Sequence, residues 1–452
     1  AQDPTACAVY LTPTKALGSD QLQATLRMVK GAGLEGIHPA PYDGDTPTES
    51  RAGIREHTRY VFTNPDMLHA SVLGSHARWA RLLRHLKYVV VDECHTYRGV
   101  FGANVALVLR RLLRIAAAYG SSPTLIYASA TAADPAGQAR RLSGREAVAV
   151  TEDAAPSGER TIVLWEPGFI EGAEGEGGAP VRYPATAEAA SVSAELLLQG
   201  ARTLTFVRSR RAAETVAMRT QEHLSAAGRA DMAERVAPYR AGYLAEDRRE
   251  LERRLDDGEL LGVASTNALE LGIDVGGLDA VVMAGFPGTV ASFRQQAGRA
   301  GRRGQSSVAV LVARDEPMDT YLVHHPAALL GTPVENSVFD PTNPFILRGH
   351  VYCAAVERPL SEADVEAFGA RDVVDDLTAA GLLRHRPAGW FAVPQLDGEI
   401  TPESAHASVS LRGGVGEQVM IVDVTDGRLL GTVDAARAMS QVHDGAVYIH
   451  QG

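Results

Sequence analysis

Short apolar runs alternate with helix-like stretches along the first part of this 452-residue chain, and this alternation restricts the fold more than any other feature. The runs cover residues 8–11, 60–63, 88–91 and 124–128 and are rich in Val, Ile and Tyr. Strands that alternate with helices favour a parallel sheet covered on both faces, with ligands at the carboxyl ends of the strands. Polar residues follow each run directly, at 12–15, 63–66, 92–95 and 129–131. The pattern therefore predicts an α/β domain with a site at one edge of its sheet.

The alternation resumes after an acidic, glycine-rich stretch at residues 171–180, which we expect to be a mobile loop. Runs at 203–207, 262–265, 280–283 and 307–312 then predict a second α/β domain. Beyond Pro341, three helical stretches and a hairpin near 387–389 are typical of a winged helix. We expect two parallel-sheet domains at 1–155 and 156–340, a winged helix at 341–400 and a small, incomplete β-rich domain at 401–452.

The composition is that of an ordinary globular protein, with 45% hydrophobic and 22% charged residues. No apolar run approaches the roughly 18 residues of a membrane span, and the first residues do not resemble a signal peptide, so we expect no membrane partner. Cys7, Cys94 and Cys353 form no C-x-x-C pair. We therefore expect neither a zinc site nor a disulfide framework, and a reducing cytoplasm fits.

The net charge of −11 gives little information about nucleic-acid binding, because the charge is unevenly distributed. Residues 1–150 carry 17 Lys and Arg against 12 Asp and Glu, whereas the rest of the chain is acidic. Binding to a phosphate backbone needs positive charge only along the contact track. An acidic protein of this kind can therefore still bind nucleic acid.

An acidic box, Asp92-Glu93-Cys94-His95, directly follows the apolar run at 88–91. Two carboxylates at the end of a buried strand can hold Mg²⁺ and orient a water beside a nucleotide, because a hard cation prefers oxygen ligands. A solvated acidic turn is the alternative, and the apolar run before the box weighs against it. We expect Cys94 to be a small buried residue rather than a nucleophile.

A segment rich in glycine and arginine, residues 295–304, lies roughly one domain further along. Arg299 and Arg302 are three positions apart, so on a helical segment they share one face, and their planar guanidiniums suit phosphate oxygens. Gln295, one turn earlier, is placed to contact the nucleotide or its water, whereas Arg303 points elsewhere. A solvated basic helix is the alternative. No G-x-x-x-x-G-K-[ST] phosphate loop occurs in the chain, so part of a nucleotide cradle is missing.

Taken together, these segments resemble the helicases of superfamily 2. The matching segments are 13–17 (motif Ia), 63–68 (the next contact motif), 92–95 (motif II), 129–131 (motif III), 206–210 (motif IV), 266–274 (motif V) and 295–302 (motif VI). Residues 42–47, 340–347, 431–434 and 447–452 are similar to the MrfA/YprA and Hrq-type branch, which includes the mycobacterial SftH helicases. The resemblance implies two RecA-like domains and an ATP-dependent 3′-to-5′ DNA helicase that acts in DNA repair. It also implies a phosphate loop before Ala1 and a four-cysteine domain after Gly452.

The resemblance assigns roles to the residues around the acidic box. Asp92 holds Mg²⁺, and Glu93 orients or deprotonates the water that attacks the γ-phosphate of ATP. His95 passes the state of the nucleotide to motif III or VI by hydrogen bonding, with Ser129 and Thr131 as coupling residues.

In the second domain, the resemblance implies that a set of residues acts on the nucleotide. Gly272 allows close approach of the backbone, and Asp274 binds a ribose hydroxyl or orients an arginine. The residues expected to act on the phosphates are Gln295, Arg299 and Arg302, the two arginines as arginine fingers.

Nucleic-acid contacts should go mostly to phosphates, because a translocating motor must tolerate every sequence. Backbone amides and hydroxyls at helix starts serve this purpose, and the candidates are Thr14, Lys15, Thr63, Asn64, Ser209, Arg210 and Thr266. Many of these residues are also good helix caps without any ligand. Trp390 and Phe391 could stack on a base or wedge the fork, although such aromatics are more often hairpin core.

The sequence is compatible with three functions. The leading hypothesis is a DNA helicase of the bacterial cytosol that binds single strands and forks, with ATP and Mg²⁺ as cofactors. An RNA helicase or remodelling ATPase would use the same motor. The third hypothesis is that the chain by itself is a catalytically silent nucleic-acid-binding module, because it lacks the phosphate loop.

Overall fold

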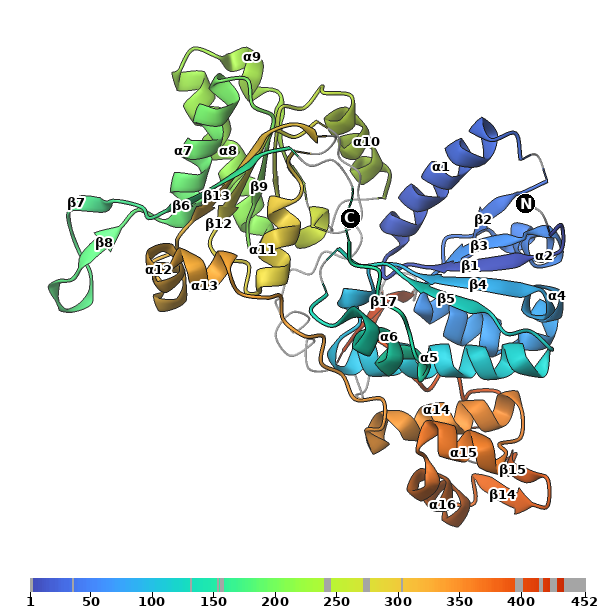
Figure 1. The fold of residues 1–452 in the computed structure, drawn as a ribbon. Helices are drawn as coiled ribbons and strands as arrows, with labels where there is room; N and C mark the ends of the chain where they lie inside the picture. The colour runs from blue at the N-terminus through green and yellow to red at the C-terminus, as the bar shows by residue number, and fades with distance from the viewer. Residues whose placement is uncertain are drawn as a thin grey trace. The chain divides into compact units, whose positions relative to one another are not determined.

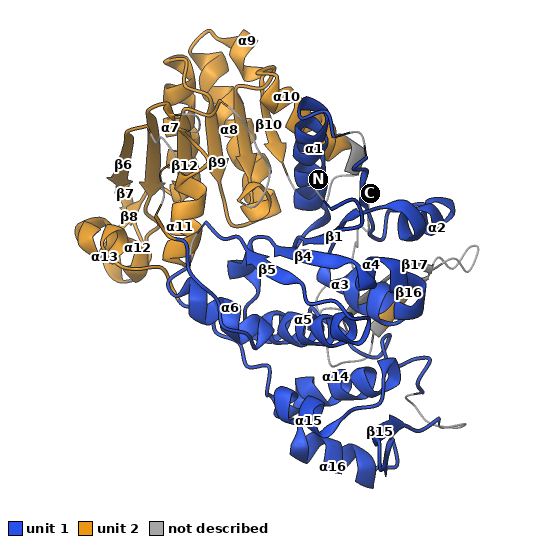
Figure 2. Ribbon diagram, turned by 45° about the vertical axis from the view of Figure 1, so that its right-hand side comes forward, with its two compact units in different colours: residues 1–150, 336–417 blue, residues 151–335, 418–452 orange. Residues whose placement is uncertain are grey.

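The structure is a computed structural model, and it describes residues 3–34, 36–130, 132–152, 154, 158–239, 245–270, 277–301, 304–394, 401–413, 418–422 and 429–434. The chain divides into two compact units, residues 1–150 with 336–417 and residues 151–335 with 418–452 (Figure 2). The first unit therefore combines the first α/β domain with the segment predicted to be a winged helix. No helix within the described ranges is long and apolar enough to cross a bilayer.

The first unit contains a five-stranded parallel sheet with strand order β2-β3-β1-β4-β5 (Figure 1). Its strands are β1 (Cys7–Leu11), β2 (Pro39–Pro41), β3 (Tyr60–Thr63), β4 (Leu86–Val91) and β5 (Thr124–Tyr127). The helices between and after them are α1 (Lys15–Gly31), α2 (Thr48–His57), α3 (Pro65–Met67), η1 (Leu68–Leu73), η2 (His76–Trp79), α4 (Ala80–Arg84), η3 (Cys94–Thr96), α5 (Gly99–Ala118) and α6 (Pro135–Ser143). The prediction of a parallel α/β sheet is confirmed.

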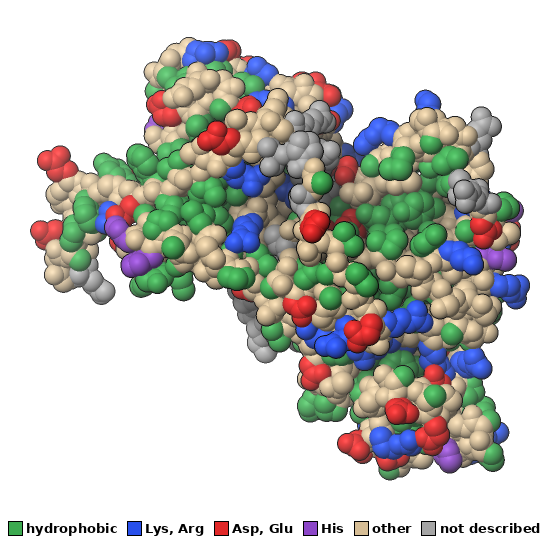
Figure 3. All heavy atoms as spheres, in the orientation of Figure 1, with side chains coloured by type: hydrophobic (Ala, Val, Ile, Leu, Met, Phe, Trp, Pro, Cys, Tyr) green, Lys and Arg blue, Asp and Glu red, His purple; other side chains and the backbone are tan. Residues whose placement is uncertain are grey.

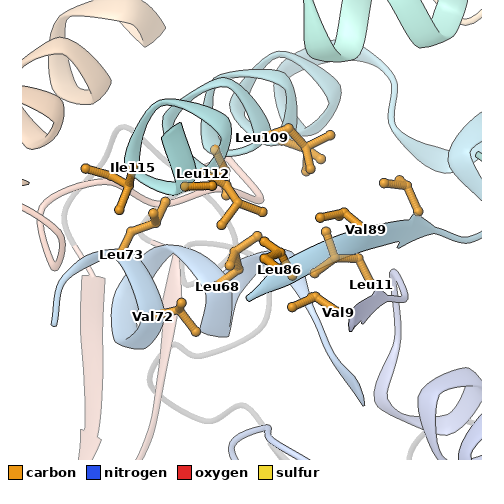
Figure 4. Close-up of a cluster of buried hydrophobic side chains, with 14 of the residues drawn as sticks. Val9, Leu11, Leu68, Val72, Leu73, Leu86, Val89, Leu109, Leu112 and Ile115 are labelled. Carbon is orange, nitrogen blue, oxygen red and sulfur yellow. The ribbon is translucent and has the colours of Figure 1, made fainter. Parts of the chain in front are cut away.

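One face of this sheet is well covered and the other is partly open. Alternate residues of β1 and β4, such as Leu11 and Val89, pack against Leu112 of α5 in a fully buried core (Figure 4). On the opposite face, Tyr88 of β4 is 50% exposed and Ile126 of β5 is 46% exposed. The prediction that helices cover both faces is therefore wrong over these two strands among the described residues.

The second unit contains a six-stranded parallel sheet with strand order β10-β11-β9-β12-β13-β6. Its strands are β6 (Arg160–Trp165), β9 (Thr203–Phe206), β10 (Val236–Tyr239), β11 (Gly262–Ser265), β12 (Ala280–Ala284) and β13 (Ser307–Val312). Its helices are α7 (Ala185–Leu198), α8 (Arg210–Ala226), α9 (Ala230–Ala233), α10 (Ala245–Asp256), η5 (Asn267–Leu269), α11 (Val290–Ala297), α12 (Pro317–His324) and α13 (Pro326–Leu330). The predicted second α/β domain is confirmed.

Alternation along β12 sends its side chains to two separate cores. Val281 and Met283 pack in one core with Phe293 of α11, whereas Val282 packs in another with Val216 of α8. Successive side chains of a strand point to opposite faces, so a continuous apolar run is what a sheet buried on both faces requires. This accounts for the uninterrupted apolar sequence of β12.

The glycine-rich stretch 171–180, expected to be a mobile loop, lies in a hairpin, and its mobility stays a prediction. It lies in an antiparallel hairpin of β7 (Phe169–Glu174) and β8 (Pro180–Arg182), with the turn η4 (Glu176–Gly178) between them. Gly177 and Gly178 have φ values of 72° and 77°, which suit a tight turn. Here turn-forming glycines mark a hairpin, and the composition alone did not distinguish it from a flexible linker.

The winged-helix segment has the predicted elements. Helices α14 (Pro344–Glu357), α15 (Glu362–Phe368) and α16 (Arg371–Ala379) are followed by the antiparallel strands β14 (Leu383–Arg386) and β15 (Gly389–Ala392). Trp390 is 5% exposed and packs in the core of this domain. The hypothesis that Trp390 stacks on a base is therefore wrong, and the alternative of a hairpin core holds; Phe391 is partly buried.

Residues 401–413 differ from the β-rich unit expected at 401–452. They form turns that pack on the first unit, where Ala405 and Leu411 are buried. A two-stranded antiparallel sheet follows, made of β16 (Gln418–Val422) and β17 (Leu429–Asp434). The rest of the predicted unit lies outside the described residues.

A buried polar cluster joins α14 to α5, and we call it the winged-helix joint: Arg111, Glu357, His69, His350, Asn104 and His406. Arg111 and Glu357 have fully buried side chains and form an ion pair in which Nε lies 3.1 Å from Oε1. The guanidinium also donates to Nδ1 of His69 and of His350, each at 3.0 Å. The joint thus fixes the winged helix on the first α/β domain through buried polar contacts.

Candidate functional site

The acidic box begins where β4 ends, at the carboxyl edge of the first sheet. The Asp92 amide donates to the carbonyl of Leu11 at 2.9 Å, which continues the sheet pairing. The Asp92 carboxylate accepts from the Tyr10 hydroxyl at 2.8 Å and from the Glu93 amide at 2.8 Å. Burial and the adjacent Asp92 raise the pKa of Tyr10, so its hydroxyl stays protonated and donates. These contacts orient an oxygen-rich group toward the sheet edge.

Glu93 has a strained backbone. Its φ of 46° and ψ of 44° are left-handed, and it is the one non-glycine residue with positive φ in the described part of the chain. Its carbonyl accepts from the Thr96 amide at 2.9 Å and from the Thr96 hydroxyl at 2.8 Å. Such a conformation costs on the order of 1–3 kcal/mol and persists at functional sites where surrounding contacts hold it. The strain is consistent with a side chain that must point in one direction.

His95 links the acidic box to the segment after β5. Its Nδ1 lies 3.3 Å from a carboxylate oxygen of Glu93 and 3.0 Å from the Ser129 hydroxyl. Burial lowers the pKa of His95 to about 4, with a further contribution from Arg98, so the imidazole is neutral near pH 7. The structure thus brings Glu93, His95 and Ser129 together.

Hydrogen bonds from Gln138 and to Ala128 fix the backbone of the acidic box at Cys94. The Gln138 side chain donates to the Cys94 carbonyl at 2.7 Å, and the Cys94 amide donates to Ala128 at 3.0 Å. Burial raises the pKa of Cys94 to about 12, so the thiol stays protonated, in agreement with the prediction of a small buried residue. Sequence reasoning missed Tyr10 and Gln138, whose roles depend on long-range register.

Four of the phosphate-contact candidates lie at neighbouring strand ends in the first unit. Thr14 and Lys15 follow β1, while Thr63 and Asn64 end β3 and follow it, and β1 pairs with β3. Thr14 caps α1 by accepting from Leu17 at 3.4 Å, and Asn64 caps α3 by accepting from Met67 at 2.9 Å. The structure therefore gathers these four residues at one edge of the sheet.

Two of these four side chains are already engaged. The Thr63 hydroxyl is buried and donates to the Tyr42 carbonyl at 2.6 Å. The Lys15 ammonium forms an ion pair with Asp45 at 2.6 Å. Lys15 is about half exposed, so a phosphate could compete with Asp45 for it, whereas the Thr63 side chain faces inward.

The second unit repeats this arrangement. Ser209 and Arg210 follow β9, Thr266 follows β11, and these two strands are paired in the sheet. Ser209 caps α8 by accepting from Ala212 at 3.1 Å, and the Arg210 side chain is exposed. The three residues therefore lie at one carboxyl edge, as in the first unit.

Gln295 and Arg299 lie at the end of α11 and beyond it. They are 8% and 9% exposed. The prediction that Arg299 continues a helix is wrong: α11 ends at Ala297, and Gly301 has a φ of 76° that a regular helix does not allow. Sequence reasoning also passed over Glu270, whose carboxylate accepts from Ser292 at 2.6 Å and from Gln296 at 2.8 Å and so ties motif V to α11.

Four predicted site residues lie outside the described part of the chain. They are Thr131, Gly272, Asp274 and Arg302, and the same holds for Arg303. Their assignments stay predictions.

Comparison with known families divides the chain into three matching regions. Residues 1–138 match the DEAD/DEAH box helicase family, and residues 188–304 match the helicase conserved C-terminal domain. Residues 339–414 match the winged helix domain of the ATP-dependent helicase HRQ1. The third match includes residues 401–413, in line with their packing on the first unit.

Two curated relatives match over the whole chain. The chain is 42% identical over 459 residues to an uncharacterized ATP-dependent helicase, YprA, of Bacillus subtilis. It is 40% identical over 462 residues to the ATP-dependent helicase HRQ1 of Saccharomyces cerevisiae. The chain spans 59% of the length of the first relative and 42% of the second.

A solved structure is similar over the same length. The crystal structure of the DUF1998 helicase MrfA bound to DNA matches with a TM-score of 0.85 and 39% identity, over 100% of this chain and 59% of that one. A second structure of that protein, bound to DNA and AMPPNP, matches with a TM-score of 0.85 and 40% identity over 99% of this chain and 61% of that one.

Proposed function

The chain belongs to the branch of superfamily 2 helicases that includes YprA, HRQ1 and MrfA, and on this premise we propose that it is the motor region of an ATP-dependent DNA helicase. The observation that supports this most is the acidic box, in which a strained Glu93 lies beside a neutral His95 at the carboxyl edge of a parallel sheet. This edge is where α/β folds bind their ligands.

The residues of the acidic box fit ATP hydrolysis with Mg²⁺. The Asp92 carboxylate, oriented by Tyr10, offers the hard oxygen ligand that Mg²⁺ prefers, and Mg²⁺ bound with the triphosphate would neutralise developing charge. The described residues contain no group of three His, Cys, Asp or Glu side chains placed for a metal, so phosphates and waters would complete its coordination. Glu93 orients the attacking water, and its contact with His95 connects that carboxylate to Ser129.

The second unit contributes the groups that act on phosphate charge. Gln295 and Arg299 reach the triphosphate from motif VI, and we assign Arg302 to the same task. Gly272 and Asp274 contact the sugar side of the nucleotide, and Thr131 acts with Ser129 in coupling.

The nucleic-acid track follows the two sets of strand ends. Residues of both units contact phosphates of one strand: Thr14, Lys15 and Asn64 in the first unit, and Ser209, Arg210 and Thr266 in the second. Thr63 contributes through its backbone, because its hydroxyl is already engaged. If the two units alternate their hold as ATP binds and ADP leaves, the protein moves along the strand, and we assign it the 3′-to-5′ direction. DNA repair in the bacterial cytosol is the proposed setting.

We propose that the complete protein supplies a phosphate loop, a motif that this chain does not contain. The open sheet face at Tyr88 and Ile126 offers apolar surface on which a further segment of the complete protein can pack. We therefore expect the chain alone to bind nucleic acid without turnover, and the complete protein to hydrolyse ATP.

The decisive experiment is strand displacement by the complete protein on matched DNA and RNA duplexes with a 3′ or a 5′ single-stranded tail. The proposal predicts ATP-dependent separation of the DNA duplex with the 3′ tail. Separation of RNA alone would assign the protein to the RNA helicases, and absence of both separation and ATP turnover would leave a binding module.

Arg302→Ala tests the assignment of motif VI. An arginine finger contributes on the order of 10³–10⁵ in turnover, so turnover should fall steeply while affinity for single-stranded DNA changes little. Equal losses of turnover and affinity would place Arg302 on the nucleic-acid track instead.

A further inference from the structure

A basic region lies between the first α/β domain and the winged helix, away from the acidic box. We call it the arginine groove, a hollow of about 730 Å³ lined by Arg110, Arg114, Arg145 and Arg358, with Asp364 and Phe391 at its winged-helix side. On the face drawn in Figure 3, basic side chains gather over α5 and α6, next to the winged helix. The groove uses none of the residues assigned to the motor.

The groove is far from the candidate nucleotide site. Helix α5 starts at Gly99, just after the acidic box, and its C-terminal half lines the groove. At 1.5 Å per residue, Arg114 lies about 22 Å along the helix axis from Gly99. A ligand in the groove would therefore not be the nucleotide of the motor.

The charge of the groove is not balanced by protein groups. Asp364 is the one acidic side chain among the lining residues, and it pairs with Arg114 at 3.0 Å. Arg114 also donates to the carbonyls of Ala354, Arg358 and Pro359, so it serves the structure. The side chains of Arg110, Arg145 and Arg358 make no ion pair with any described residue.

Arg110 is the most constrained of these unpaired arginines. Its terminal nitrogen donates to the Arg141 carbonyl at 2.9 Å, and its buried Nε has no hydrogen-bond partner in the described structure. Burial lowers the pKa of Arg110, as expected for a cation that loses water without gaining an anion. A ligand anion would supply the missing acceptor.

The shape and chemistry of the groove select the class of anion. Guanidiniums bind phosphate oxygens through paired N–H donors, and several of them along a groove suit a chain of phosphates better than a single ion. Phe391 is partly exposed at the rim, with the Arg386 guanidinium 5.3 Å from its ring, and can stack on a base. Arg145 and Arg358 are both exposed. Arg145 follows α6 of the first α/β domain, and Arg358 precedes α15 of the winged helix.

We propose that the arginine groove binds the phosphodiester backbone of a single nucleic-acid strand, as a second contact outside the motor track. The proposal rests on the proposed function only in taking nucleic acid as the ligand, and it assigns a new site. A strand that reaches both the groove and the motor must be longer than one that occupies the motor alone, so the site adds affinity for long strands.

The test is the binding of labelled single-stranded DNA to the whole protein without nucleotide, measured by fluorescence anisotropy. Strands of about 6 and about 20 nucleotides separate the two sites, because a strand advances roughly 3.4 Å per nucleotide. Arg145→Glu/Arg358→Glu should weaken binding of the long strand by on the order of tenfold and lower its salt slope by about 1.4, the value for two phosphates. Binding of the short strand should change less, because a short strand cannot occupy both sites at once.

The matched control is Arg78→Glu/Arg84→Glu, which makes the same charge change at two exposed arginines of the same unit outside the groove. Equal long-strand affinities and salt slopes in the two double variants would overturn the proposal. The milder Arg145→Gln/Arg358→Gln variant repeats the test if charge reversal unfolds the protein. Since no turnover is measured, failure of this test leaves the motor assignment untouched, and an inactive motor leaves this test intact.

A small phosphate ligand would give a different result. Binding of inorganic pyrophosphate that the Arg145→Glu/Arg358→Glu variant loses, together with unchanged long-strand affinity, would contradict a nucleic-acid ligand. A photo-crosslinking side chain at Ala388, on the groove lining, gives a second readout: it should crosslink to the long strand, and Arg145→Glu/Arg358→Glu should weaken that crosslink. No crosslink to the long strand, or a crosslink that the double substitution leaves unchanged, would contradict the proposal.

Discussion

The acidic box and the winged-helix joint use the same kinds of side chain in opposite ways. In the joint, the Arg111 and Glu357 side chains are 0% exposed, and both ring nitrogens of His69 and of His350 have a partner. In the box, the Glu93 carboxylate is 15% exposed, His95 is 10% exposed, and the backbone of Glu93 is strained. The Arg111–Glu357 pair is sealed from solvent, whereas the Glu93 carboxylate of the box is partly exposed and its backbone is strained.

The hydrogen bonds of the joint fix its tautomers. Arg111 donates to Nδ1 of both His69 and His350, so each ring carries its proton on Nε2 and donates it, to the His406 carbonyl and to Asn104 respectively. Buried polar groups that all have hydrogen-bond partners stabilise a structure, whereas strained residues near solvent are typical of functional sites. The difference between the regions predicts where substitutions should cost activity and where they should cost stability.

The largest expected effect is on turnover at the acidic box. Glu93→Gln in the complete protein should lower the rate of ATP hydrolysis by about 10²–10⁴, because the amide cannot act as a base, while nucleotide and DNA binding persist. The control is Glu56→Gln, at an exposed glutamate of α2. Steady-state turnover near the wild-type rate would remove Glu93 from the mechanism.

The next effect is on stability at the joint. Glu357→Ala should lower the free energy of unfolding by about 3–5 kcal/mol, because it leaves the Arg111 charge buried without a partner. Urea unfolding measures the loss, and Glu250→Gln, in an exposed ion pair with Arg253, should cost less than about 1 kcal/mol. Similar losses in both variants would mean that the joint is not sealed.

A smaller effect concerns pH. Burial, together with the Arg111 charge, lowers the pKa of His69 to about 3 and that of His350 well below its usual value, beside His406 and Glu357. At these two histidines the unfolded chain then binds more protons between the folded pKa and about 6.5, so they leave stability unchanged above about pH 6.5 and lower it below that pH. Each histidine contributes up to about 1.4 kcal/mol per pH unit in that window.

His69→Gln checks this prediction, because glutamine keeps one donor and one acceptor but does not titrate. The slope of unfolding free energy against pH, measured between pH 5 and about 6.5, should fall by the contribution of one histidine. An unchanged slope would show that His69 is not the titrating group.

The smallest effect tests the strain at the box. Glu93→Gly should raise the free energy of unfolding by about 1 kcal/mol, because glycine adopts positive φ without strain. Glu93→Ala also removes the carboxylate but keeps the strain, so it should give no such gain. Equal stability of the two variants in thermal unfolding would mean that the left-handed backbone carries no cost.

The sequence predicted the central strands better than the edge strands. β11 and β13 begin and end at the predicted residues, since continuous apolar runs mark strands buried on both faces. β2 and β10 were missed because they contain proline, at Pro39, Pro41 and Pro238. Both are edge strands, the place in a sheet where a missing N–H is tolerated.

The acidic box was predicted from local sequence, but the residues that hydrogen-bond to it were not. Asp92 and His95 lie next to an apolar run, so a short window identifies them. Tyr10 and Gln138 contact the box only because of strand order and helix packing, which no local pattern encodes. The buried ion pair of Arg111 was not predicted for the same reason, because its partner Glu357 lies 246 positions away.

The central claim is that the acidic box and motif VI act on one triphosphate. The measurement that tests it most directly is a structure of the complete protein with DNA, Mg²⁺ and a non-hydrolysable ATP analogue. The account predicts that Asp92 and Glu93 lie on the metal and water side of the γ-phosphate while Arg299 or Arg302 contacts its oxygens. A triphosphate bound in contact with neither the two carboxylates nor the two arginines would contradict it.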